Sequence, residues 1–261
     1  MGKFWSILFL LVPVLGIALF VWAPWAGYWL PPDISTHGHQ IDHLFYFVLW
    51  LTGVVFAVTE GVLFWFLWRY DAQSNRDPVK YTHGSHNLEV IWTILPAATL
   101  LFIAIYQMNA WADVKMRIPK GLEKKPTVEV FARQFEWRLR YPGPDGVLGT
   151  PDDIHHVNDL HVPLDEEVMV QLKSMDVLHD FFLPHLRIKQ DAVPGMQIPV
   201  WFRATEPGTY DLVCAELCGW GHYKMKGRLT VETRARFDQW LREMAAAQET
   251  SQDPAPEDAD E

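Results

Sequence analysis

Cysteine and positive charge are both scarce in this sequence of 261 residues. Two cysteines cannot build the multi-bridge framework that holds small secreted domains together, so the fold must depend on an apolar core or on a membrane. Neither cysteine lies in a Cys-x-x-Cys-His motif, which excludes covalently attached haem. Acidic residues outnumber basic ones by 32 to 22, and the net charge is −10. This charge disfavours nucleic acid as a partner and favours a basic protein.

Charge of either sign is almost missing from three long apolar runs in the first 110 residues. Residues 4–30 contain no charge, residues 44–68 contain only Glu60, and residues 88–108 contain only Glu89. A helix needs about 20 apolar residues to cross the hydrocarbon layer of a bilayer. We therefore predict three transmembrane helices and a membrane-anchored protein in contact with lipid.

The first of these runs, within residues 1–30, is either a signal peptide or an extra transmembrane helix. A cleavage site needs small residues at two nearby positions, and Pro24 interrupts the candidates around Ala23 and Ala26. We interpret the run as a retained helix that ends in a belt of aromatic residues at the membrane surface.

The other two runs predict a helical hairpin within residues 31–110. Its connecting loop carries Arg69, Arg76 and Lys80, and basic loops stay on the cytoplasmic side of a membrane. The chain after the hairpin then lies on the periplasmic side of a bacterial inner membrane. Residues 31–42, which include two histidines, are expected to form a solvated connector.

Short alternating runs follow, and turn residues separate them. They predict an antiparallel β-sandwich or barrel within residues 111–232. The expected strands are residues 128–131, 135–141, 168–172, 198–203, 209–213 and 226–232. Apolar residues at helical spacing predict an amphipathic helix over residues 233–248 that packs on the domain or on a neighbour. The acidic residues 249–261 are expected to be disordered.

Both cysteines lie in one turn-rich segment with other soft ligands. Cys214 and Cys218 are followed by His222 and Met225. Thiolate, imidazole and thioether are ligands that copper prefers, and two thiolates at this spacing can each bridge two copper ions. The backbone carbonyl of Glu216 is a further donor. The alternative is a structural disulfide, the commoner use of two cysteines in an exported domain.

A second histidine is needed to complete such a pair of copper sites. His179 is the best placed, in the segment Ser174-Met-Asp-Val-Leu-His179. The order His…Cys-x3-Cys-x3-His-x2-Met after Ser-x-Asp-Val-x-His is similar to the dinuclear CuA motif of subunit II of the haem-copper cytochrome c oxidases. The resemblance covers residues 41–232 and implies a cupredoxin Greek key with the metal ligands in loops at one end.

The resemblance also implies an activity and partners. A subunit of this family takes one electron at a time from cytochrome c or a similar basic donor. It passes the electron to haem in subunit I, where O2 is reduced to water and protons are pumped. The segment around Glu89 resembles the helix whose glutamate stands at the entrance of a proton channel. In the family, the side chain at the position of Glu216 helps to hold Mg²⁺ at the boundary with subunit I.

The sequence departs from the family at the aromatic patch that accepts the electron. The family pattern Gln-Trp-x-Trp is Gln134-Phe-Glu-Trp137 here, so Phe135 replaces the first Trp. Trp137 and Trp220 are then the candidates for the electron-accepting aromatic residue. No role in the family corresponds to Glu60, which we expect to face the catalytic subunit.

Two other classes of protein use similar residues. The CuA subunit of a nitric oxide reductase-type enzyme has a similar copper loop. A membrane-anchored copper carrier binds and hands on one ion through a cysteine pair, but it has no need of Met225 at this spacing. The segment around Glu89 favours the oxidase.

Overall fold

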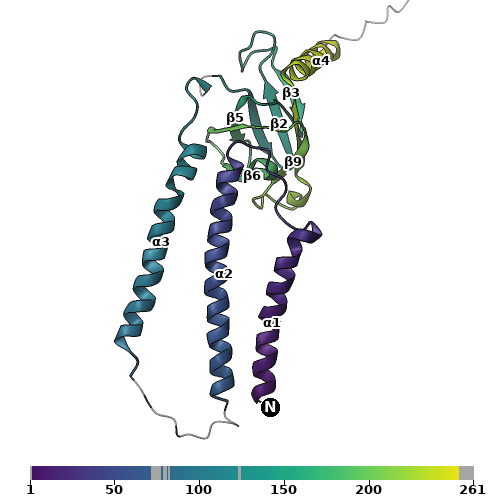
Figure 1. Cartoon of the computed structure of the whole chain (residues 1–261). Helices are drawn as coiled ribbons and strands as arrows, with labels where there is room; N and C mark the ends of the chain where they lie inside the picture. Colours follow the sequence, from purple (N-terminus) through teal and green to yellow (C-terminus); the bar gives the residue numbers. More distant parts are fainter. Residues whose placement is uncertain (1, 72–77, 79–80, 82, 123–124, 253–261) are drawn as a thin grey trace, which may run out of the picture. The chain divides into compact units, whose positions relative to one another are not determined.

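The computed structural model describes residues 2–71, 78, 81, 83–122 and 125–252, and it divides into two compact units (Figure 1). The first unit is Met1–Pro31 with Asp42–Met108, and the second is Pro32–Ile41 with Asn109–Glu261. Arg76 and Lys80 of the predicted basic loop lie outside the described residues, as do residues 253–261 of the predicted tail.

The first unit consists of helices with apolar surfaces. Helix α1 spans Gly2–Trp22 and is followed by a 3-10 turn at Ala23–Ala26, α2 spans Gly38–Arg69, and α3 spans His86–Lys115. All three α-helices are long and apolar enough to cross a membrane, which confirms the prediction of three spans.

Side-chain contacts connect α1 and α2 near both of their ends. After α1, Trp29 donates a hydrogen bond of 2.7 Å from Nε1 to the hydroxyl of Tyr46. At the opposite end, the ammonium group of Lys3 lies 5.0 Å from the centre of the Trp68 ring. The two helices therefore lie antiparallel to each other.

The second unit is a sandwich of two five-stranded sheets, with strand orders β3-β2-β1-β5-β8 and β4-β10-β9-β6-β7. In chain order the strands are β1 Val128–Arg133, β2 Glu136–Tyr141, β3 Ile154–Val157, β4 Asp159–Pro163, β5 Glu167–Ser174, β6 His179–Leu183, β7 Ile188–Ala192, β8 Ile198–Arg203, β9 Gly208–Cys214 and β10 Lys226–Glu232. Six of them match the predicted strands, whereas β3, β4, β6 and β7 were not predicted.

Not all of the strand pairs are antiparallel. Strands β1 and β5 pair in parallel, as do β4 and β10. The prediction of a purely antiparallel sandwich was therefore wrong for these two pairs. Parallel neighbours arise because the chain crosses between the sheets before it returns, as it does in a Greek key. The result is the cupredoxin-like sandwich that the resemblance implies.

The core of the sandwich is made of inward-facing side chains from both sheets. Trp137 and Tyr141 of β2, Phe181 of β6 and Phe202 of β8 have no exposed surface. Side chains alternate between the two faces of a strand, so β2 buries every second residue and turns the intervening ones outward. Burial of each large apolar side chain contributes about 1.5–3 kcal/mol.

The connector between α1 and α2 packs on the sandwich. Ser35 pairs with Ala204, the residue after β8, as an isolated β-bridge. The Ile34 amide donates to the carbonyl of His185 at 2.9 Å, and the Ile34 side chain is fully buried. His37 is only 8% exposed. The expectation of a solvated connector was therefore wrong for this part, because the strand-like segment finds backbone partners at the edge of the sheet.

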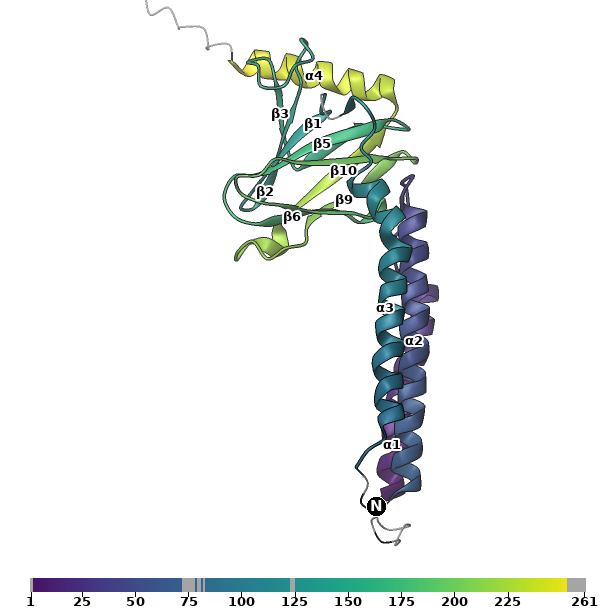
Figure 2. The same cartoon turned by 90° about the vertical axis from the view of Figure 1, so that its left-hand side faces the viewer.

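Helix α4, Arg234–Gln252, covers the β3 and β4 side of the sandwich (Figure 2). Phe237 and Trp240 are buried in the domain core. Of the two expected alternatives, the structure shows the C-terminal helix packed on its own domain. The helix continues four residues beyond the predicted end at residue 248, so residues 249–252 are helical rather than disordered.

Candidate metal centre

Neighbouring strands bring the predicted ligands to one end of the sandwich. His179 is the first residue of β6 and Cys214 is the last residue of β9. These strands pair so that Phe181 is opposite Cys214. The loop after β9 then carries Cys218, and a 3-10 turn that begins at His222 leads to Met225 and β10.

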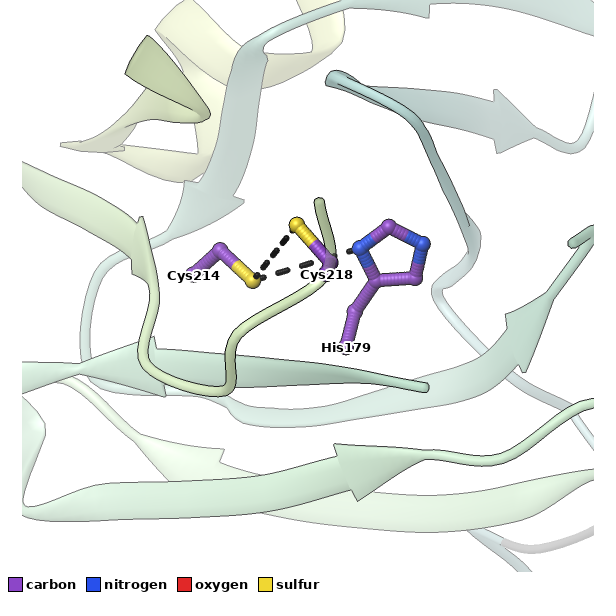
Figure 3. A group of neighbouring side chains, drawn as sticks. All are labelled: His179, Cys214 and Cys218. Atoms are coloured by element: carbon purple, nitrogen blue, oxygen red, sulfur yellow. Dashed lines mark hydrogen bonds between the residues drawn. The ribbon is translucent and has the colours of Figure 1, made fainter. Parts of the chain in front are cut away.

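The Cys214 sulfur is surrounded by three of the predicted donors. It lies 3.9 Å from Nδ1 of His179, 3.2 Å from the carbonyl oxygen of Glu216 and 3.8 Å from the Cys218 sulfur. Figure 3 shows the imidazole and the two sulfur atoms directed toward one another. The three groups could hold a metal ion together, and all three residues are buried.

The Cys218 sulfur has the remaining two donors. It lies 3.6 Å from Nδ1 of His222 and 3.8 Å from the Met225 sulfur. Both cysteines are free thiols, which does not support the alternative of a structural disulfide. Each of the two sulfurs thus has one imidazole and one weaker donor beside it, and the weaker donor is a backbone carbonyl for Cys214 and a thioether for Cys218. This donor set fits a pair of soft metal ions that share both thiolates.

A carboxylate and an amide outside the donor set hold it in place. Asp176 accepts a hydrogen bond of 2.8 Å from Nε2 of His179, which leaves Nδ1 directed at Cys214. The second oxygen of Asp176 accepts from the backbone amide of Gln134 at 2.8 Å. The side-chain amide of Gln134 in turn donates to the carbonyl of Cys218 at 2.5 Å. Such outer contacts fix the orientation of a metal-binding histidine.

The site makes its two thiols chemically different. Burial alone would raise the pKa of Cys214, but the hydrogen bond with His179 and hydrogen bonds from the backbone outweigh burial and lower this pKa. Burial raises the pKa of Cys218, and the neighbouring Cys214 sulfur adds to the increase. Because metals bind thiolates, a cation that binds both sulfurs must displace any proton that the pair still holds.

The aromatic candidates occupy different environments. Trp137 is fully buried, with its ring centre 6.3 Å from that of His179. Trp220 is 83% exposed and packs edge-on against Phe135, with ring centres 5.3 Å apart. Phe135 also packs tightly against the loop backbone, because a Cβ atom on Gly221 would lie 2.5 Å from its ring. Only Trp220 of these candidates can contact a partner at the surface directly.

The predicted acidic residues Glu60 and Glu89 belong to the helical unit, whereas the donor set belongs to the sandwich. Glu89 is in the first turn of α3, where the helix dipole favours a negative charge. Glu60 is half-buried on α2. Asp176 and Gln134 were not predicted as site residues, although the position of Asp176 three residues before His179 could have indicated a hydrogen bond between them.

Two family profiles match the chain. The transmembrane domain of cytochrome c oxidase subunit II matches residues 23–110, and its periplasmic domain matches residues 148–232. The chain is 30% identical over 258 residues to the alternative cytochrome c oxidase subunit 2 of Bradyrhizobium diazoefficiens, with 90% of each chain covered. It is 27% identical over 287 residues to cytochrome c oxidase subunit 2 of Thermostichus vulcanus, with 88% of this chain and 84% of that one covered.

Solved structures include a similar domain. The periplasmic domain of cytochrome oxidase subunit II from Bradyrhizobium japonicum matches with a TM-score of 0.42 and 25% identity, and the match covers 47% of this chain and 94% of that one. The matched profiles and the relative at 30% identity cover both the helices and the sandwich. The chain therefore belongs to the family of subunit II of cytochrome c oxidase, a membrane-bound oxidoreductase with its sandwich domain on the periplasmic side.

Proposed function

We propose that this chain is the electron-accepting subunit of a cytochrome c oxidase in a bacterial inner membrane, and that its six donors hold a dinuclear copper centre. The observation that carries the proposal is the arrangement of His179, Glu216, His222 and Met225 around two free thiols. Held by these residues, a copper pair would supply a one-electron centre between cytochrome c or a similar donor and the haem of subunit I, where O2 would be reduced and protons pumped.

The protein residues have separate roles in this proposal. Asp176 keeps His179 in the orientation in which Nδ1 is available, and Gln134 holds the carbonyl of Cys218. The stiff sheet limits movement of the ligands as the charge at the site changes. A copper carrier must release its ion, so it does not need rigidly held ligands. One copper per chain without a mixed-valence EPR signal would indicate a carrier.

Metal analysis and copper EPR of the purified complex test the proposal. We expect two coppers per chain and a hyperfine pattern from two equivalent nuclei. Replacement of Cys218 by Ser should remove this pattern while the helical unit stays in the membrane. One copper per chain after full reconstitution would contradict the dinuclear centre.

Trp220 is our proposed surface contact for the electron donor, with Phe135 packed beneath it. Trp220→Leu should slow oxidation of cytochrome c, whereas Phe135→Leu should have a smaller effect. Trp137→Leu probes the core rather than the surface, because this ring has no exposed area. Unchanged donor oxidation in the Trp220 variant would reject this contact.

Two carboxylates complete the proposal. Glu89 would deliver protons from the cytoplasmic end of α3 to the channel in subunit I, so Glu89→Gln should slow the reductive phase of turnover.

The half-buried side chain of Glu216 would contribute to an Mg²⁺ site shared with subunit I. Loss of bound Mg²⁺ in a Glu216→Gln complex that retains both coppers would support this role, because the contact of Glu216 with the Cys214 sulfur is made by its backbone carbonyl, which the substitution keeps.

A further inference from the structure

Three large apolar side chains are exposed at the metal end of the sandwich. Leu217, Trp220 and Tyr223 lie in the segment between β9 and β10, and they are 77%, 83% and 68% exposed. We call these three residues the loop face. Large apolar side chains that share one exposed surface mark a site of contact with another molecule. The same segment carries Cys218 and His222, so such a contact would form within a few residues of the metal centre.

Basic side chains lie around the loop face. The ammonium group of Lys224 is 5.4 Å from the centre of the Tyr223 ring. Lys226 is the first residue of β10, at the end of the same segment. Arg133 is the last residue of β1, before the turn that packs on Trp220. We call Arg133, Lys224 and Lys226 the basic rim, and all three side chains are exposed.

The acids at this end are engaged by other groups. Glu136 pairs with Arg138 at 2.7 Å, and Asp176 accepts a hydrogen bond of 2.8 Å from His179. The side chain of Glu216 is half-buried. Within the part of the chain that the structure describes, no carboxylate pairs with a member of the basic rim. The surface around the thiols therefore presents unpaired positive charge, although the net charge of the chain is −10.

The opposite end of the sandwich is acidic. Strand β5 begins there at Glu167 and runs to Ser174 at the metal end. The loops after β2, β4 and β8 lie at the same acidic end, and their exposed acids are Asp145, Asp152, Asp165 and Glu206. The 8 residues of β5 span about 25 Å, whereas the Debye length at physiological ionic strength is about 8 Å. A partner at the metal end is therefore attracted or repelled by the basic rim rather than by the net charge of the chain.

The unpaired charges distinguish this surface from a permanent contact with another subunit. Burial of an unpaired charge against a subunit is costly, and lysine is depleted in the buried parts of stable interfaces. A soluble partner that binds and leaves can keep the ammonium groups hydrated at the edge of a small apolar contact. Such a partner must carry carboxylates where it meets the basic rim.

We propose that the metal end of the sandwich is the docking surface for an acidic one-electron carrier protein, whose carboxylates face the basic rim and whose exposed redox edge contacts the loop face. This inference rests on the proposed function and specifies its electron donor. One electron leaves the carrier, which is oxidised, and enters the metal centre of this chain, which is reduced. No proton or chemical group is exchanged. The net charge of the sequence favours a basic donor, and the local charge reverses that expectation.

Two forms of one cytochrome, both oxidised, test the proposal by their binding to the purified oxidase complex in detergent. The first is a basic mitochondrial cytochrome c. The second is the same protein with its lysines succinylated, which reverses their charge and keeps the haem. Biolayer interferometry measures the two dissociation constants from about 10 to about 150 mM salt. We expect the succinylated form to bind about tenfold more tightly at the lowest salt, and this advantage should disappear at the highest.

Charge reversal at the basic rim should remove the preference. Lys224→Glu combined with Lys226→Glu should weaken binding of the succinylated form about tenfold at low salt and strengthen binding of the unmodified form. The matched control is Arg203→Glu combined with Arg242→Glu, which changes the net charge equally. Both control residues are exposed, and they lie at the acidic end, where β8 ends and where α4 meets the loop after β2. The control should change either dissociation constant less than about twofold.

The loop face should contribute at every salt concentration, because apolar contact is not screened by ions. Leu217→Ser should weaken binding of both forms. Val147→Ser, which also removes an exposed apolar side chain but lies in the loop after β2, should not. Acetylation of lysines measures access independently. Lys224 should react in the complex alone and be protected when the succinylated cytochrome is bound.

The binding assay and the copper measurements can fail separately. One copper per chain would contradict the proposed function without changing the order of the two dissociation constants, because the assay involves no turnover. Tighter binding of the unmodified form would overturn the docking proposal, and so would equal effects of the rim and control variants. Protection of Lys224 in the complex without a cytochrome would also overturn it, because another subunit would then cover this surface.

Discussion

The charge of His161 should make the stability of the sandwich depend on pH. His161 of β4 is stacked on Trp240 of α4, with parallel rings 3.9 Å apart. Its Nδ1 lies 2.8 Å from Glu232 and its Nε2 lies 3.5 Å from Asp159. Burial alone would lower the pKa of His161, but the two carboxylates outweigh burial and raise it. Asp159, with its pKa lowered to about 2, stays ionised throughout the range of interest.

The sign of the effect follows from the direction of this pKa shift. An unfolded histidine has a pKa of about 6.5, and in the folded chain that of His161 is higher. The stabilisation from its charge is therefore fully present below about pH 6.5 and is lost as the pH rises through the folded-state pKa. One titrating group changes the free energy of unfolding by at most about 1.4 kcal/mol per pH unit.

Replacement of His161 by Gln removes the charged partner of Glu232. Asp159 keeps Arg228 at 2.6 Å and Thr230 at 3.0 Å, whereas Glu232 keeps the more distant Arg236 at 3.8 Å. The side chains of His161 and Glu232 are 11% and 14% exposed, so water screens their interaction little. We expect a loss of about 2–3 kcal/mol at pH 6, the size of one partly buried charged hydrogen bond, and about 1 kcal/mol at pH 9.

Pulse proteolysis of the full chain in detergent, over a urea series at pH 6, 7.5 and 9, measures these free energies. His156→Gln is the matched control, because burial lowers the pKa of His156 and its contribution has the opposite sign. The wild type should lose stability from pH 6 to 9 by more than the His161→Gln variant does. Parallel pH profiles for the two proteins would refute the role of the charge.

Three further predictions concern the metal centre. Asp176→Ala should lower copper affinity about 10- to 100-fold, measured by competition with a chelator, because His179 loses the acceptor that orients it. Gly221→Ala should destabilise the domain by about 1–3 kcal/mol in urea unfolding, since the new methyl group meets the Phe135 ring, and the same substitution in a Phe135→Leu background should cost less. Removal of copper by a chelator should lower the melting temperature of the wild type but not of Cys218→Ser, because a ligand of the folded state stabilises only that state.

Sequence patterns were sufficient to predict the helices and those strands in which polar and apolar residues alternate clearly. The strands that were not predicted do not show this alternation. Strand β3 has only four residues, two of which are histidines, and β6 buries four of its five residues on both faces. A strand that is buried on both sides shows no alternation of polar and apolar residues. The packing of the connector on the sandwich depends on a sheet edge formed almost 170 residues later, which no local pattern contains.

The metal ligands close to the cysteines could be predicted because they share one segment. The outer contacts could not, since Gln134 and Asp176 are separated by 42 residues and meet only when β1 and β5 pair. The sequence also does not show which of two tryptophan side chains is exposed to solvent. Trp137 and Trp220 are chemically equivalent candidates in the sequence, but one is in the core and the other is at the surface.

The register between β6 and β9 connects the fold to the chemistry of the site. His179 precedes Cys214 by 35 residues, and the two meet because Phe181 is opposite Cys214. Side chains alternate along a strand, so a slip of one residue would turn His179 to the other face and separate its imidazole from the sulfur. The packing of Phe181 against Trp137, with ring centres 5.6 Å apart, resists such a slip because it would expose a buried aromatic side chain. The apolar core therefore determines the position of a ligand that the loop sequence alone cannot supply.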